Sequence, residues 1–248
     1  MPDLDSTALR IRIAAVVLAF APACRSAGSD TADFAPPEAA TVNAAATPAR
    51  PAHTQDTLAE TPVADGQSHA TIGEPAPDFE LADLEGRRYK LSHFRGKMIV
   101  LEWFNPDCAA VVYAYGEGEL REMRARHASN GIVWLTINSS PPGESGADLA
   151  LNQQFVAAHH LSQPILLDPT GVVGRSYGAR TTPEMYVVNE RGVLVYSGAL
   201  DNAPRGRVQS LAQKTNYVEM AIADLRSGHA VTQTTSRPYG CEIKYVKP

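Results

Sequence analysis

The sequence has few cysteines, little net charge and no long apolar segment, and each shortage excludes a class of protein. Three cysteines among 248 residues are too few and too far apart for a disulfide-stapled small fold or a zinc ribbon. The formal net charge is −5, so no basic field would attract a phosphate backbone, and nucleic acid is not an expected partner. With 44% hydrophobic and 20% charged residues, the composition is that of a soluble globular protein.

The first 24 residues have the layout of a secretory signal. Arg10 and Arg12 precede an apolar run from Ile13 to Ala21, which is too short to cross a bilayer core of about 30 Å as a helix. Small residues then lead to Cys24, and the four residues ending there resemble a bacterial lipobox. We expect residues 1–24 to be a signal peptide that directs the protein to the bacterial periplasm or cell envelope.

Two outcomes remain open for Cys24. In a lipobox the cysteine is lipidated and becomes the mature N-terminus, so the only contact with a membrane would be that lipid anchor. The alternative is ordinary cleavage after a small residue, which removes Cys24 or leaves it free.

Residues 25–70 predict a disordered linker. The segment is rich in Ala, Pro, Thr and acidic residues, and Phe34 is its only aromatic residue. Such a stretch buries too little apolar surface to offset the entropy of ordering it. It would act as a tether between an anchor and a folded domain at 71–248.

The folded part alternates strands with helices. Apolar runs predict strands ending near Leu81 and covering 98–104, 132–137 and 165–167, with a final hairpin of 185–189 and 193–197. Helices are expected over 109–127, 148–160 and 217–226, the first with a break near Gly116 and Gly118. This order predicts an α/β fold with a mixed central sheet flanked by helices on both faces.

Three separated motifs resemble one family. They are the segment Gly73–Phe79, the strand and turn that lead to Cys108, and the segment Gly178–Val187. Together they are similar to the alkyl hydroperoxide reductase/thiol-specific antioxidant group of thioredoxin-fold proteins, over about 71–199. The tail at 237–245 resembles that of a peroxiredoxin-like subfamily. The resemblance implies a thioredoxin-like redoxin with antioxidant or oxidoreductase activity.

Cys108 is the expected nucleophile. It stands at the start of a predicted helix, where free backbone N–H groups and the helix dipole favour a thiolate. The resemblance implies roles for two further sites. Glu102, in the preceding strand, matches the buried carboxylate that handles protons in thioredoxins, unless it lies at a sheet rim or pairs with a basic residue. Pro183, after Thr182, matches the cis-proline that faces the cysteine and leaves a backbone edge free for a bound chain.

The loop departs from the familiar patterns. A thioredoxin-type dithiol would place its second cysteine at Val111, so a redox cycle within the loop is excluded. A typical peroxiredoxin would have Thr or Ser where Asn105 stands and an arginine near Pro183. Peroxide reduction would therefore need substitute donors from Asn105 or Arg180.

Cys241 offers a partner for Cys108. A resolving thiol there would complete a cycle through an intramolecular disulfide. The alternatives are a static disulfide or an isolated thiol in a mobile tail, and bridged Cα atoms must lie within about 7 Å.

These residues predict a cell-envelope thiol oxidoreductase. Its substrate would be a thiol or disulfide protein or a small peroxide, a partner thiol would reduce it, and no cofactor or metal is expected. His159 and His160 point to different helix faces and do not form a ligand set. The rival hypothesis is a catalytically degenerate redoxin that binds a partner or ligand.

Overall fold

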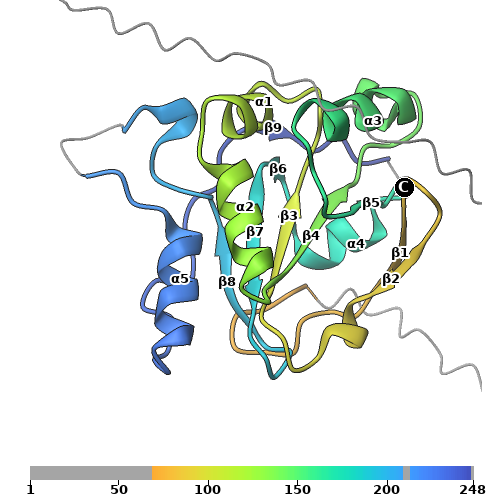
Figure 1. Ribbon diagram of the computed structural model, residues 1–248. Coiled ribbons are helices and arrows are strands. Elements are labelled where there is room, and N and C mark those ends of the chain that lie inside the picture. The colour runs from red at the N-terminus through yellow and green to blue at the C-terminus, as the bar shows by residue number, and fades with distance from the viewer. Residues whose placement is uncertain (1–68, 209–212, 247–248) are drawn as a thin grey trace, which may run out of the picture. The chain divides into compact units, whose positions relative to one another are not determined.

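The computed structural model describes residues 69–208 and 213–246, and Figure 1 shows their arrangement. The predicted signal peptide, Cys24 and nearly all of the predicted linker lie outside these ranges. None of the helices within the described ranges combines the length and apolar character needed to cross a membrane.

A seven-stranded mixed sheet forms the centre, in the order β2-β1-β5-β4-β3-β7-β8. Parallel pairing joins β3 to β4 and β4 to β5, whereas all other neighbours in this sheet are antiparallel. The strands are β1 (Glu80–Asp83), β2 (Arg88–Lys90), β3 (Ile99–Trp103), β4 (Val133–Asn138), β5 (Ile165–Leu167), β7 (Glu184–Val188) and β8 (Leu194–Gly198). The predicted mixed sheet is confirmed.

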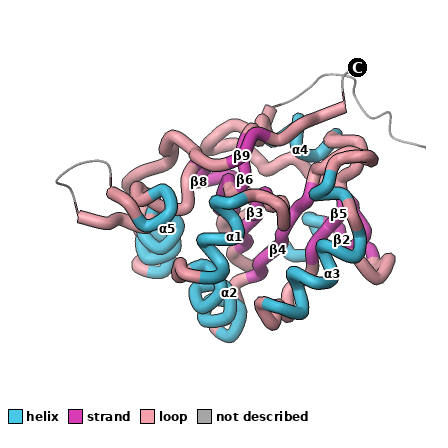
Figure 2. Tube along the Cα trace, turned by 90° about the horizontal axis from the view of Figure 1, so that it is seen from above, coloured by secondary structure: helices cyan, strands magenta, loops and turns pink. Residues whose placement is uncertain are grey.

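Helices cover both faces of this sheet, as predicted. They are α1 (Ala109–Gly116), α2 (Leu120–Ser129), α3 (Leu149–Ala158), α4 (Val172–Tyr177) and α5 (Tyr217–Arg226), with 3-10 turns at Leu91–Phe94, Ser145–Ala147 and Pro204–Gly206. One apolar cluster joins α1, α2, α3 and α5 to the sheet, and a second joins α4 to its other face. Seen from above, α4 lies across the sheet from α1, α2 and α3 (Figure 2).

The central strand β3 is buried along its whole length, which explains its continuous apolar run. Successive side chains point to opposite faces. Ile99, Leu101 and Trp103 therefore belong to the cluster beneath α4, and Val100 to the cluster beneath α1. By the same alternation Glu102 points toward the α1 side.

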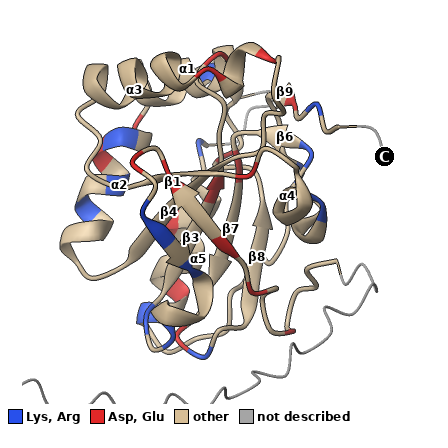
Figure 3. Ribbon diagram, turned by 90° about the vertical axis from the view of Figure 1, so that its right-hand side faces the viewer, with Lys and Arg blue, Asp and Glu red and all other residues tan. Residues whose placement is uncertain are grey.

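Surface charges of both signs are interspersed, as Figure 3 shows for one side of the ribbon. Several pair directly, including Arg88 with Glu80 between β2 and β1, and Arg126 with Glu219 between α2 and α5. Exposed pairs of this kind add little stability individually.

The sequence did not predict β2, α4 or a small second sheet. In that second sheet β6 (Thr181–Thr182) pairs antiparallel with β9 (Cys241–Glu242), which brings the C-terminal segment to the end of the central sheet near α1 (Figure 1).

The predicted helix over 109–127 is two helices, and Gly118 lies in the turn between them. A side-chain carbon at Gly118 would approach the Ala114 carbonyl oxygen to 2.8 Å, whereas one at Gly116 would meet no atom within 4 Å. The tight turn therefore depends on the absence of a side chain at Gly118 alone.

This difference gives a prediction for stability. Gly118→Ala should lower the free energy of unfolding by about 1–3 kcal/mol, because the backbone of α1 must shift. Gly116→Ala should change it by about 1 kcal/mol or less, in the stabilising direction. Urea unfolding of both oxidised variants checks this, and equal effects would contradict it.

Candidate functional site: a disulfide at the start of a helix

Cys108 immediately precedes α1, as predicted. Its carbonyl accepts the first hydrogen bond of the helix, from the Val112 N–H (2.8 Å), and its own N–H donates to the Asn105 carbonyl in the turn after β3 (3.1 Å). The N–H groups of the first residues of α1 have no partner within the helix. Cys108 is therefore the N-cap residue of α1, and it is only 1% exposed.

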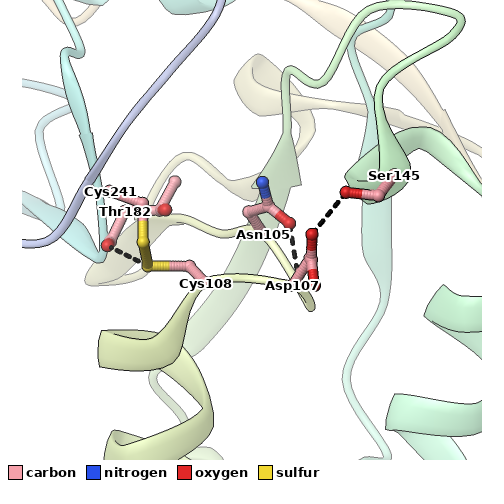
Figure 4. Close-up of a disulfide and its surroundings, with 6 residues drawn as sticks. All are labelled: Asn105, Asp107, Cys108, Ser145, Thr182 and Cys241. Carbon is pink, nitrogen blue, oxygen red and sulfur yellow. Dashed lines mark hydrogen bonds between the residues drawn. A yellow bond between two sulfur atoms is a disulfide. The ribbon is translucent and has the colours of Figure 1, made fainter.

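Cys108 forms a disulfide with Cys241 across 133 residues, and the two Cα atoms are 5.7 Å apart (Figure 4). Strand pairing holds Cys241 in place, since β9 pairs with β6 so that Cys241 lies opposite Thr182. Of the alternatives for Cys241, the isolated thiol is therefore not what the structure shows.

Thr182 lies directly against this disulfide, and Pro183 follows it. The peptide bond between them is cis, as the resemblance implied. The Thr182 carbonyl oxygen lies 3.1 Å from the Cys108 sulfur. A sulfur in a disulfide carries no hydrogen to donate, but after reduction a Cys108 thiol at this place would donate to that carbonyl.

A pocket of about 170 Å³ opens beside the disulfide, and both cysteines line it. Its walls come from the turn after β3, the loop between β4 and α3, Thr182 and the C-terminal segment 241–244. Its polar lining includes Asn105, Ser140 and Glu144. The pocket thus lies next to the disulfide, although Cys108 itself is buried.

Glu102 lies in the interior of the sheet rather than at its rim. Its carboxylate accepts hydrogen bonds from the Tyr115 hydroxyl (2.8 and 2.9 Å) and from the Trp134 indole (2.8 Å). The Arg124 Nε lies 3.8 Å from it, and both side chains are fully buried. Glu102 thus pairs with an arginine, as one of the alternatives held, within the buried set Glu102, Tyr115, Arg124 and Trp134, which we call the Glu102 cluster.

Burial controls the protonation of this cluster. Loss of water around the carboxylate raises the pKa of Glu102, and this effect exceeds the opposing influence of Arg124 and of the hydrogen bonds. Burial likewise raises the pKa of Tyr115 well above its usual value. Among the described residues no hydrogen bond joins Glu102 to Cys108, so its proton-handling role stays a prediction.

The two substitute donors for a peroxide are differently placed. Asn105 lines the pocket, but its side-chain oxygen accepts the Asp107 N–H (2.8 Å), and Asp107 in turn accepts from Ser145 (Figure 4). Arg180 is exposed, and its backbone N–H donates to Glu184 (2.8 Å). Neither side chain is seen to donate a hydrogen bond at the Cys108 sulfur.

Sequence reasoning missed three members of the Glu102 cluster. Trp134 lies in an apolar strand, where the sequence indicates only a core residue, but its indole N–H donates to Glu102. Tyr115 lies seven residues after Cys108, about two turns along α1, and this spacing was the one available signal. No sequence pattern indicates Arg124, because it reaches Glu102 only through tertiary packing.

Fold and site together define a thioredoxin-like redoxin. The profile of the AhpC/TSA family matches residues 72–197, half of the chain, and the protein belongs to that family. The predicted family is thus confirmed.

Individual relatives carry a more specific description. The chain is 29% identical over 125 residues to the thiol-disulfide oxidoreductase ResA of Geobacillus thermodenitrificans, a match that covers 49% of this chain and 65% of that protein, just under two thirds. It is 30% identical over 132 residues to the ResA of Halalkalibacterium halodurans, covering 52% of this chain and 69% of the relative. A crystal structure of a hypothetical protein from Sinorhizobium meliloti superposes with a TM-score of 0.63 at 26% identity, over 72% of this chain and 96% of that one.

The raised pKa of Glu102 predicts a pH-dependent stability. Folding favours the protonated carboxyl, so this contribution is fully present below the ordinary glutamate pKa near 4.5 and is lost as the pH rises through the higher folded value. The free energy of unfolding of the wild type minus that of Glu102→Gln should therefore fall as the pH rises above 4.5. Denaturant unfolding across this range checks it, with Glu117→Gln, an exposed site, as control. A difference that rises with pH would contradict it.

Proposed function

We propose that this protein is a thiol-disulfide oxidoreductase in which Cys108 is the nucleophile and Cys241 the resolving thiol. One observation carries the proposal: a cysteine at a helix start is joined to a second cysteine opposite a cis-proline, beside a pocket that admits a thiol. The two ResA relatives are described as thiol-disulfide oxidoreductases, which supports this class of reaction.

The reaction is a two-electron exchange between dithiol and disulfide. The Cys108 thiolate attacks one sulfur of a substrate disulfide, forms a mixed disulfide and releases the other substrate sulfur as a thiolate. The Cys241 thiolate then attacks the Cys108 sulfur, releases the second substrate thiolate and closes the Cys108–Cys241 bond. The substrate gains two electrons, the protein loses two, and a partner dithiol restores the reduced protein by the reverse steps.

Glu102 would assist these steps as the predicted proton handler. It projects toward the face that carries α1, and Tyr115 of that helix holds its carboxylate. A pKa raised by burial brings a carboxylic acid closer to neutral pH, where exchange of a proton with a thiol is easiest.

Peroxide reduction is the less supported branch of the sequence hypothesis. The Thr182 carbonyl oxygen, 3.1 Å from the Cys108 sulfur, is an acceptor, whereas a peroxide needs donors to polarise its O–O bond. The rate of oxidation of the reduced protein by hydrogen peroxide can be measured by stopped flow. We expect Cys108 to react no faster than a free thiol does.

The rival hypothesis of a degenerate binding module loses its main support. Absence of a second cysteine in the loop favoured it, but Cys241 supplies that second sulfur. It would prevail if Cys108→Ser kept full cellular function.

A trapping experiment tests the proposed function. With reduced protein and insulin as a disulfide substrate, Cys241→Ser should accumulate a mixed disulfide through Cys108, because no second thiol resolves it. With Cys24→Ser in every protein, the wild-type pair should pass to the intramolecular disulfide, and Cys108→Ser should form far less mixed disulfide, because its Cys241 does not start a helix. Mass spectrometry of acid-quenched samples checks this. Equal trapping by the two single variants would contradict it.

We also propose that the protein works in the cell envelope, tethered through lipidated Cys24. The basic residues, apolar run and lipobox-like residues of the first 24 positions support this. Expressed with its full N-terminus in a bacterium, the wild type should partition into the detergent phase and Cys24→Ser into the aqueous phase. A wild type found in the aqueous phase would argue against lipidation.

A further inference from the structure

The C-terminal segment Gly240–Tyr245 lies along the free edge of β6 and ends in a slot beside α4. Its strand β9 pairs with β6, and the Ile243 N–H donates to the Arg180 carbonyl (2.9 Å), which continues the backbone pairing. This segment is therefore bound as an added strand, and Cys241 is the residue that delivers its sulfur to Cys108.

Gly240, Ile243 and Tyr245 of this segment each fit a specific feature of the edge. At Gly240, φ is +124° and any side-chain carbon would overlap the Thr182 carbonyl, so only glycine fits there. Ile243 is half-buried and packs against the apolar cluster beneath α4.

Tyr245 makes the third specific contact. Its hydroxyl donates to the Ala179 carbonyl (2.8 Å), and the Arg175 guanidinium lies over its ring, 5.3 Å from the centroid. Gly171 and Gly174 leave the room for that ring, since a side-chain carbon at either would collide with it. By contrast Glu242 and Val246 are exposed.

We propose that Gly240–Tyr245 occupies, in the oxidised protein, the docking edge for substrate, and that the preferred substrate is an extended polypeptide segment of the same chemistry. Such a segment has glycine before the reactive cysteine, an aliphatic residue two positions after it and an aromatic residue four positions after it. This inference rests on the proposed function and adds two points to it. The first is the sequence preference just given, which we call the recognition rule. The second is that the chain's own segment competes with substrate for the edge, and we call that segment the internal competitor.

The redox state then controls access to the edge. While the Cys108–Cys241 bond is intact, β9 covers β6 and forms one wall of the pocket, so only small thiols reach the sulfurs. Reduction breaks the Cys108–Cys241 bond. The segment is then held only by a few backbone hydrogen bonds and by the contacts of Tyr245. A partner strand can then displace it and place its own sulfur against Cys108.

A peptide series on the full chain tests this proposal. The probe is the heptapeptide Tyr-Gly-Cys-Glu-Ile-Lys-Tyr with its cysteine activated as a thionitrobenzoate disulfide. Cys108 of the Cys241→Ser protein attacks the peptide sulfur and releases thionitrobenzoate, whose absorbance gives the rate. We expect peptides with alanine in place of the glycine or of the last tyrosine to react at least tenfold more slowly.

A pair of second-site variants tests the internal competitor. Added to Cys241→Ser, Tyr245→Ala should speed the reaction with the heptapeptide several-fold, because the chain's own segment is held less firmly. Val246→Ala, at an exposed neighbour, should leave the rate unchanged. Reaction with 5,5′-dithiobis(2-nitrobenzoate), a small disulfide, measures the intrinsic reactivity of Cys108 in each protein, and circular dichroism checks that each is folded.

The outcomes separate the two proposals. Reaction of all peptides at one rate, with normal reaction of the small disulfide, would overturn the recognition rule and leave the oxidoreductase standing. An unchanged heptapeptide rate in the Tyr245→Ala protein would overturn the internal competitor. A Cys108 that reacts with none of the disulfides would contradict the proposed function itself.

Discussion

The bond between Cys108 and Cys241 joins the start of α1 to strand β9, which pairs with β6. Cys108 is fixed because β3 ends in a turn that leads directly into α1. Cys241 is fixed because β9 pairs with β6 next to the cis Thr182–Pro183 bond. Each sulfur is thus positioned by backbone geometry, and a pocket lies beside them.

The Glu102 cluster gives the site a rigid and electrostatically unusual foundation. It links β3, β4, α1 and α2 through one carboxylate, one phenol, one indole and one guanidinium, all buried. Removal of one partner from a buried ion pair commonly costs about 3–5 kcal/mol, because the other charge is left uncompensated. Burial of the Glu102–Arg124 pair also carries a desolvation cost, which the raised pKa of Glu102 reflects.

The fold was largely readable from the sequence, since the elements with strong apolar patterns were predicted with small errors at their ends. The central strand and the final hairpin are examples, because burial on both faces and a tight Gly192 turn leave plain signals. Helix α4 was missed because it has only six residues between Gly171 and Gly178, too few for a periodic pattern. Strands β6 and β9 have two residues each, and their pairing depends on contacts 60 residues apart along the chain.

The site was readable only in part for the same reason. Cys108, Pro183 and Thr182 carry local or family signals, and the structure brings them together with Cys241. The arginine partner of Glu102 and the slot for Tyr245 arise from packing between distant segments, which one sequence does not encode in a visible pattern.

A redox titration of the full chain is the most direct test of Cys108 and Cys241 as a working pair. The folded protein would be equilibrated in dithiothreitol or glutathione buffers and its thiols counted by alkylation and mass spectrometry. A working pair should interconvert reversibly, with a midpoint in the range of roughly −270 to −120 mV covered by thioredoxins and disulfide oxidants. A disulfide that stays oxidised until the protein unfolds would be a purely structural bond, and the oxidoreductase mechanism would be wrong.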